Sequence, residues 1–363
     1  MSVRNFIATV LMFLLGWLPT QASAQGYGGL GTRAEGFYVP KRGAAIEFPR
    51  DHGAHPGFRI EWWYLTANLR GEDGRQYGVQ WTLFRSALMP PDQQAIASKS
   101  DWQTSQLWMG HAAVTTPDSH HVAETRARGV FDIAGVKVAP FKAWINDWQM
   151  AARNEAADGI GAVDLRASGA DFSYDLSLTA NGPMVFHGDR GYSVKSAEGQ
   201  ASYYYSQPFY QVEGEIDLPT GRVKVAGTAW LDREWSSQPL SQDQRGWDWV
   251  SLNFDDGSKL MGFRLRQSDG KNFTSATWID ADGTATAYSN NKVRLTEISR
   301  STTAGRLVPT TWRVELAERG IDVTVEALNT NAWMDTSFPY WEGPVNIDGS
   351  HSGAGYLEMT GYE

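Results

Sequence analysis

Acidic side chains set among tryptophans are the residues of this sequence best suited to chemistry. In the run Trp230-Leu231-Asp232-Arg233-Glu234-Trp235, period-two alternation places Trp230, Asp232 and Glu234 on one face of a strand. If that face borders an apolar cavity, the pKa of the carboxyl rises, as a proton donor requires. If it faces water, Asp232 and Arg233 form an ionic patch at a domain junction. We name Asp232 and Glu234 as candidate catalytic residues, with both interpretations open.

A second aromatic run, Ile60-Glu61-Trp62-Trp63-Tyr64, is predicted to line a binding cavity. Alternation puts Trp62 and Tyr64 on one face and Glu61 and Trp63 on the other, and one face of a barrel strand looks into the lumen. The residues predicted to contact a ligand are Trp62, Trp63, Tyr64, Trp81, His111, Tyr203, Tyr205, Trp230, Trp247 and Trp249. Of these, His111 is either a hydrogen-bonded structural histidine or a polar anchor in the pocket.

Several classes of chemistry find no support in the sequence. The run Asp51-His52-Gly53-Ala54-His55 resembles a metal-binding box, but its glycine and the following Pro56 prevent a helix, and no second cluster completes a site. The chain has 0 Cys, and it has no Gly-x-Ser-x-Gly elbow or glycine-rich phosphate loop. A net charge of −9 argues against nucleic acid as a partner. We therefore expect neither a metal nor a cofactor.

The elements that must position these residues are strands. Alternating runs such as 172–178 and 321–326 are typical of half-buried antiparallel strands, and no long stretch shows a helical period. Five Asp-Gly pairs suit hairpin turns: Asp73-Gly74, Asp158-Gly159, Asp256-Gly257, Asp269-Gly270 and Asp282-Gly283. The stretch 89–94 is expected to be an exposed loop. The sequence predicts an all-β fold.

An internal repeat divides the chain in two. The segment Trp62–Leu69, followed by Asp73-Gly74 and a strand opening around Gly78, aligns with Trp247–Phe254, followed by Asp256-Gly257 and Gly262. Both are an aromatic strand, a hairpin turn and a second strand. We predict two antiparallel β-barrel or sandwich domains in tandem, with residues 37–228 forming the first and residues 229–363 the second.

The N-terminus has the pattern of a secretory signal peptide. Arg4 supplies a positive charge, 6–18 is apolar, and Ala22-Ser23-Ala24 provides a small-x-small cleavage motif. We predict a signal peptide over 1–24 and a flexible leader over 25–36. The mature protein is expected in the periplasm or outside the cell, with no integral membrane span, because the apolar run is shorter than the roughly 20 residues that a span needs.

The chain resembles the lipocalin-like family related to carotenoid 1,2-hydratase (hydroxyneurosporene synthase), whose secreted members are described as AttH-like or as predicted secreted hydrolases. The matching stretches are Phe48–His52, Glu61–Tyr64, Gly110–Val114, Trp230–Ser236, Trp247–Trp249, Tyr340–Gly343 and Gly355–Tyr362. They extend over nearly the whole mature chain. The resemblance implies two lipocalin-like β domains that meet at a shared pocket.

The resemblance also implies a chemistry. Hydratases of this family add water to an alkene, with an acidic residue in an aromatic-x-Asp motif that corresponds to Trp230-Leu231-Asp232 here. The hydratases carry tyrosine at the aromatic position, and a histidine and a tryptophan upstream. This chain has Trp230 and, in roughly the upstream place, Tyr203-Tyr204-Tyr205. The fold therefore transfers more directly than the activity.

Three functions remain open at this stage. The first is an enzyme of hydratase or hydrolase type that uses Asp232 on an apolar, isoprenoid or polyene small molecule. The second is a carrier that holds a lipophilic ligand without chemistry and works with an envelope transport system. The third is a structural envelope protein whose 16 Trp and 14 Tyr only fill cores. The sequence specifies neither the ligand nor the oligomeric state.

Overall fold

A computed structural model describes residues 34–97, 104–153 and 159–362. The predicted signal peptide and all but the last three residues of the predicted leader lie outside this part of the chain. Within it, none of the helices has the length and apolar character needed to cross a membrane. The few helices are α2 (Pro91–Ala97), η2 (Arg50–His52) and η3 (Ala317–Arg319).

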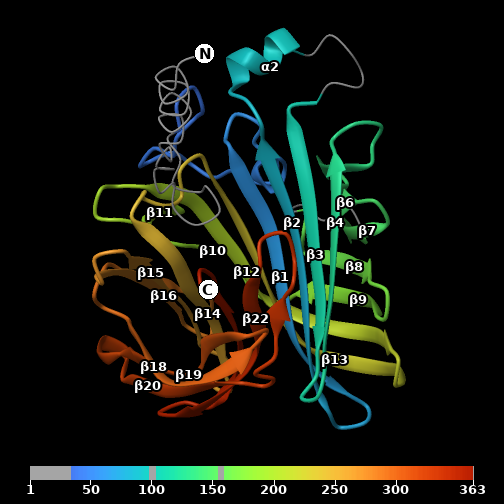
Figure 1. Ribbon diagram of the computed structural model, residues 1–363, viewed down its shortest axis with the longest axis vertical. Coiled ribbons are helices and arrows are strands. Elements are labelled where there is room, and N and C mark those ends of the chain that lie inside the picture. Colours follow the sequence, from blue (N-terminus) through green and yellow to red (C-terminus); the bar gives the residue numbers. More distant parts are fainter. Residues whose placement is uncertain (1–33, 98–103, 154–158, 363) are drawn as a thin grey trace, which may run out of the picture.

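The N-terminal part of the chain folds into one large antiparallel sheet, which curls into a nearly closed barrel (Figure 1). Its strands are β1 (Ile60–Gly71), β2 (Gln76–Ala87), β3 (Gln106–Thr115), β4 (His120–Arg128), β5 (Ala134–Val138), β6 (Phe141–Ile145), β7 (Trp148–Ala152), β8 (Ala162–Ser168), β9 (Ser173–Ala180), β10 (Val185–Phe186), β11 (Tyr192–Val194), β12 (Ala201–Leu218) and β13 (Gly221–Ser236). The order across the sheet is β4-β3-β2-β1-β13-β12-β9-β8-β7-β6-β5, and β10 and β11 pair with β12.

The C-terminal part forms a second antiparallel sheet with the shape of a half-barrel. Its strands are β14 (Gln244–Phe254), β15 (Lys259–Gln267), β16 (Asn272–Ile279), β17 (Ala285–Tyr288), β18 (Arg294–Thr303), β19 (Arg306–Leu316), β20 (Ile321–Ala327), β21 (Trp333–Met334), β22 (Tyr340–Gly349) and β23 (Gly353–Met359). The order is β17-β16-β15-β14-β23-β22-β20-β19-β18, and β21 pairs with β22.

The two sheets have matching topologies, as the internal repeat predicted. In each sheet the first strand pairs on one side with the second and on the other with the last, β13 in the first sheet and β23 in the second. The all-β, lipocalin-like prediction is confirmed. The predicted boundary at 228/229 falls inside β13, which pairs with β1 as far as Ser236. The chain passes to the second sheet only between β13 and β14.

Alternation along the strands assigns each side chain to one of two buried faces. In β1, Trp63 and Leu65 point into the core of the first barrel, whereas Tyr64 packs in a separate cluster between the sheets. In β14, Val250 belongs to the core of the second sheet and Trp249 to the same intersheet cluster. The sheets touch where β1 meets β23 and where β2 meets β22.

Local sequence explains most of the connections. Four of the Asp-Gly pairs occupy tight turns between consecutive strands, with the glycines at φ between 79° and 89°, which favours glycine. Asp158 lies outside the described residues. The expected loop at 89–94 is wrong in part, because α2 begins there. Pro91 occupies its first position, where a missing N–H costs no helical hydrogen bond.

A buried ionic cluster fixes the start of β1 against β13 and β2. The Glu61 carboxylate, with 0% exposure, accepts hydrogen bonds from Arg85 Nε and Arg233 Nη2, and lies 3.1 Å from His55 Nδ1. The Arg233 guanidinium also covers the ring of Trp63 at 3.8 Å. Burial alone would raise the pKa of Glu61, but the two arginines and His55 outweigh burial and hold it below its usual range. Glu61 is therefore a permanently charged structural residue.

The variant Glu61→Gln should lower the free energy of unfolding by about 3 kcal/mol, because Arg85 and Arg233 would stay buried without a carboxylate. Urea unfolding at neutral pH measures the loss. The matched control is Asp322→Asn, which removes a carboxylate from the exposed pair with Arg313 and should change stability far less, because water screens that pair. Equal losses in the two variants would contradict a structural role specific to the Glu61 cluster.

Candidate functional site

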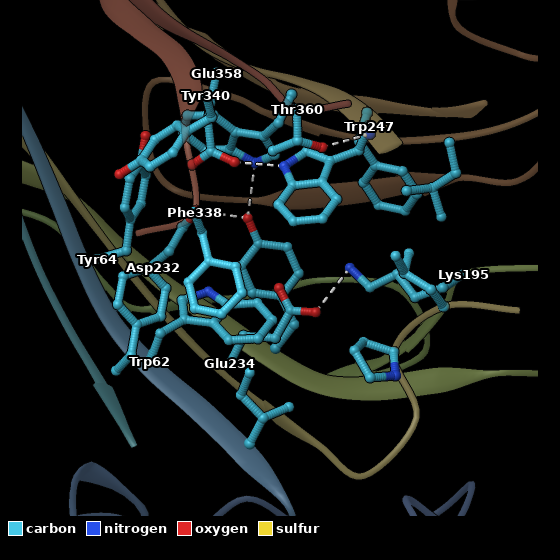
Figure 2. Close-up of a pocket in the computed structure, with 18 of the residues that line it drawn as sticks. Trp62, Tyr64, Lys195, Asp232, Glu234, Trp247, Phe338, Tyr340, Glu358 and Thr360 are labelled. Atoms are coloured by element: carbon cyan, nitrogen blue, oxygen red, sulfur yellow. Dashed lines mark hydrogen bonds and ion pairs between the residues drawn. The ribbon is translucent and has the colours of Figure 1, made fainter. Parts of the chain in front are cut away.

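A cavity of about 240 Å³ lies between the two sheets, outside both cores. Figure 2 shows its walls, which are mainly aromatic and aliphatic, with a few carboxyl groups and one lysine. The lining residues are Ile60, Trp62, Tyr64, Phe84, Ser86, Met109, His111, Lys195, Tyr204, Asp232, Glu234, Pro239, Leu240, Trp247, Trp249, Phe263, Leu265, Phe338, Tyr340, Glu358 and Thr360. An apolar hollow with a few convergent polar groups is the usual form of a small-molecule site.

Two equivalent strand pairs face each other across this cavity. In the first sheet Tyr64 of β1 is the direct register partner of Asp232 in β13. In the second sheet Trp249 of β14 is the register partner of Glu358 in β23. Both pairs come from the first and last strands of their sheets. The repeat therefore places one aromatic residue and one carboxyl group from each sheet at the cavity.

Asp232 is buried and accepts hydrogen bonds from three donors. Its Oδ1 accepts from Trp230 Nε1 at 2.6 Å and from Ser206 Oγ, and its Oδ2 accepts from the Tyr204 hydroxyl at 2.6 Å. Burial raises the pKa of Asp232 to about 7, because it disfavours the charged form more than the three donors favour it. No cation contacts this carboxyl among the described residues. Asp232 can thus carry a proton near neutral pH and give it up there.

Glu358 is the second carboxyl group at the cavity whose pKa is raised to the neutral range. Its Oε1 accepts from Trp247 Nε1, and its side chain is partly exposed to the cavity (Figure 2). The surrounding protein removes water from the carboxyl and raises its pKa to about 7, and the nearby Asp232 and Glu234 add to the rise. The cavity therefore holds two carboxyl groups that titrate in the same range.

Glu234 has a different environment from its neighbour two positions away. Its Oε1 lies 3.0 Å from Lys195 Nζ and accepts from Ser202 Oγ. The Lys195 ammonium also lies 4.7 Å from the Tyr204 ring centre and 4.4 Å from that of Phe263. Glu234 is therefore paired with a cation, whereas Asp232 meets none among the described residues. Of the two predicted carboxyls, Asp232 is the one with the raised pKa of a proton donor.

At another part of the wall, hydrogen bonds join the cavity to deeper groups. The Tyr64 hydroxyl donates to Glu342 Oε1 at 2.6 Å, and burial raises the pKa of Glu342 well above its usual range. His111 Nδ1 lies 3.0 Å from the Tyr340 hydroxyl, and His111 Nε2 lies 3.3 Å from Glu124 Oε2. His111 is thus both hydrogen-bonded, as a structural histidine would be, and part of the cavity wall, as a polar anchor would be.

The structure brings some of the predicted site residues together and places others elsewhere. Those at the cavity are Trp62, Tyr64, His111, Asp232, Glu234, Trp247 and Trp249. Trp63, Trp81, Tyr203 and Tyr205 instead fill the core of the first barrel, because their strand faces point into its lumen. Trp230 packs between the sheets and donates a hydrogen bond to Asp232, but it does not line the cavity.

Sequence reasoning missed several lining residues, above all Tyr204, Lys195, Glu358 and Tyr340. Tyr204 lies between the two tyrosines that were predicted, on the opposite face of β12, so the alternation was visible but the choice of face was not. Glu358 could have been found by extending the repeat to the last strand of each half. No local signal distinguishes Lys195, which lies between β11 and β12.

The site is suited to proton transfer in an apolar pocket. Within residues 34–97, 104–153 and 159–362, no group of three or more His, Cys, Asp or Glu side chains is placed to hold a metal ion. The carboxyls of Asp232 and Glu358 can exchange protons, and the faces of Trp62, Trp247 and Trp249 can stabilise a positive charge.

Comparison with known proteins agrees with this architecture. A family model described as AttH-like matches residues 39–362. The crystal structure of a candidate AttH from Nitrosomonas europaea is 33% identical in sequence, with a TM-score of 0.78, over 90% of this chain and 100% of that chain. The crystal structure of kievitone hydratase from Nectria haematococca is 13% identical, with a TM-score of 0.65, over 90% of this chain and 98% of that chain, a likeness that shows the fold alone. Among curated proteins no sequence matches.

The raised pKa of Asp232 predicts how stability changes with pH. Between its ordinary value of 3.8 and about 7, the folded chain keeps a proton that the unfolded chain has lost, so stability falls as pH rises through this window. The variant Asp232→Asn removes this contribution. From pH 5 to pH 8, urea unfolding should show the native chain losing about 2 kcal/mol more than the variant.

The control for that measurement is Asp217→Asn, the same change at an exposed position near the end of β12. It should follow the pH dependence of the native chain. Parallel pH curves for the native chain and Asp232→Asn would show that Asp232 does not titrate in this window.

Proposed function

The chain belongs to the AttH-like family, and we propose that it binds a mainly apolar small molecule between its two sheets and uses Asp232 as an acid to hydrate it. The observation that carries the proposal is a carboxyl group at an aromatic cavity that meets no cation among the residues the structure describes, with its pKa raised by burial to about 7. An acid with a pKa near the working pH is the most effective proton donor. The mainly apolar walls favour a ligand with little charge.

Hydration of an alkene matches the groups at the cavity. The carboxyl proton of Asp232 forms a C–H bond with one alkene carbon as the π bond breaks, which leaves a carbocation at the other carbon. The faces of Trp62, Trp247 and Trp249 stabilise that cation. A water molecule then forms the C–O bond, and the proton that it loses restores the carboxyl. The sum is the addition of one water, with no oxidant, reductant or cofactor.

Support also comes from a relative with the same fold. Kievitone hydratase is named for the addition of water, and at 13% identity it lends this chain its architecture, not its substrate. An alkene as substrate is therefore our proposal for this chain, and the family resemblance suggests an isoprenoid or polyene. The alternative is a carrier that holds the same ligand without turnover, and loss of the acid separates the two.

The test uses the full mature chain with probes that carry a trisubstituted alkene, geraniol and squalene, in water labelled with heavy oxygen. Mass spectrometry should detect a product one labelled water heavier than the probe. Asp232→Asn should lower the rate by at least about 100-fold, as expected for loss of a general acid. It should still bind the probe, which quenching of tryptophan fluorescence reports.

Asp217→Asn is the control for that assay and should keep the native rate. Binding of the probes without turnover by the native chain would favour the carrier. If neither probe binds and no apolar compound co-purifies with the protein, the ligand-binding proposal fails.

We further propose that the protein acts outside the cytoplasm, as a cleaved signal peptide over 1–24 would require. The proposal rests on the charged, apolar and small-residue segments at the N-terminus alone. Mass spectrometry of the protein purified from its native source should give a mature N-terminus at Gln25. Recovery of the uncleaved chain from the cytoplasmic fraction would overturn the assignment.

A further inference from the structure

A chain of buried hydrogen bonds begins at Asp232 and leads away from the cavity. Ser206 Oγ donates to Asp232 Oδ1 and lies 2.6 Å from His187 Nε2. His187 Nδ1 lies 2.9 Å from Thr277 Oγ1, on β16 of the second sheet. Ser206, His187 and Thr277 are at most 1% exposed, and none of them lines the cavity. The chain therefore connects the back of Asp232 to the other sheet through the protein interior.

The chemistry of these groups allows only a few proton arrangements. A serine hydroxyl has one proton to donate, and a neutral imidazole has one N–H and one bare nitrogen. Burial, with the charge of Lys195, lowers the pKa of His187 well below its usual value, so the ring stays neutral. The His187 ring packs against the Tyr204 ring, with 4.1 Å between the two ring centres. His187 can therefore change its tautomer but neither its charge nor its position.

We propose that Ser206 and His187 form a relay in which the tautomer of His187 follows the protonation of Asp232. When Asp232 is ionised, Ser206 donates to its Oδ1, and His187 Nε2–H donates to Ser206. Thr277 Oγ1 then donates to the bare Nδ1. When Asp232 is protonated on Oδ1, it donates to Ser206, which donates to the bare Nε2, and Nδ1–H donates to Thr277. Each group stays hydrogen-bonded in both states.

The relay links the protonation of Asp232 to the protein interior. Between the two states the carboxyl gains one O–H bond with a proton from the cavity side. His187 exchanges its Nε2–H bond for an Nδ1–H bond, so the net change is the one proton taken up by Asp232. The part played in turnover rests on the proposed function, in which Asp232 must regain its proton. His187 and Ser206 are then positioning residues, since neither touches the ligand space.

Other titratable groups that face the relay must be separated from it. Glu234, on the strand of Asp232, is paired with Lys195 from the β11–β12 connection. Tyr204 of β12 donates to Asp232, and burial raises its pKa well above the usual value. Glu358 of β23 titrates near the same pH as Asp232. Only Asp232 is hydrogen-bonded to Ser206 among these groups.

The experiment is nitrogen NMR of the ligand-free full chain with labelled histidine, from about pH 5.5 to about pH 8.5, a range centred on the pKa of Asp232. The two ring nitrogens of His187 should exchange their protonated and bare signals with a midpoint near 7, and the tautomer ratio should change roughly tenfold per pH unit there. His120 is an internal control. It is half-buried, its Nδ1 lies 2.9 Å from Thr115 Oγ1, and its pKa is lowered to about 4, so it should not respond near pH 7.

Four variants assign the effect. Asp232→Asn and Ser206→Ala should each fix the tautomer of His187 across the pH range, and Ser206→Thr should restore the exchange because it keeps the hydroxyl. Glu358→Gln should leave the exchange in place. A constant tautomer in the native chain, or an exchange that persists in Asp232→Asn, would overturn the relay. If Ser206→Ala does not fold, the result for Asp232→Asn is sufficient to decide whether the relay exists.

The outcome is independent of any substrate, because the measurement uses the protein without ligand. Tautomer exchange without hydration of the probes would support the relay and count against the proposed function. Hydration of the probes without tautomer exchange would support the proposed function and overturn the relay.

Discussion

The pairing of β1 with β13 is the interaction on which the rest of the structure depends. In chain order the two strands are the first and last long strands of their sheet, and β1 pairs with β13 over the whole length of β1, from Ile60–Ser236 to Gly71–Val225. Both faces of this pair are buried, one in the barrel core and one between the sheets. The core face carries the Glu61 cluster and the other carries Tyr64 and Asp232. A one-residue slip in register would exchange the two sets and destroy both sites.

The two faces bury carboxyl groups in opposite ways. Glu61 forms ion pairs with Arg85 and Arg233, which stabilise its charged form, so its pKa falls. Asp232 has hydrogen-bond donors but, in the described part of the chain, no cation beside it, so burial dominates and its pKa rises to about 7. The first arrangement holds the barrel together at any physiological pH. The second leaves a group free to exchange a proton, which is the property that an acid catalyst needs.

Duplication of the sheet explains why the site lies at the interface. Each sheet fills its own core with large side chains. The closing strands of both sheets present their outer faces to each other and contribute Tyr64 with Asp232 and Trp249 with Glu358. Two related halves thus make a cavity whose two titratable carboxyls come from different sheets.

The sequence by itself determined the local features. Alternation gave the strands and their faces, Asp-Gly pairs gave turns, and the repeat gave two related sheets. It also put Asp232 beside Trp230 and placed Trp62 with Tyr64. These features depend on neighbours within a few residues, which a single sequence displays directly.

Only the tertiary structure decided which face borders the cavity. It turned Tyr204 rather than Tyr203 and Tyr205 toward Asp232, and it brought Glu358 near that carboxyl from the last strand of the second sheet. It also placed His187, from the β10–β11 connection, against Ser206, which donates to Asp232. The predicted boundary at 228/229 moved beyond Ser236 for the same reason, since strand pairing with β1 set the end of β13. Contacts of this kind depend on how two sheets pack, and period-two patterns look the same whichever face is turned inward. The proton chemistry of Asp232 arises from that packing, because burial, not sequence neighbours, raises its pKa.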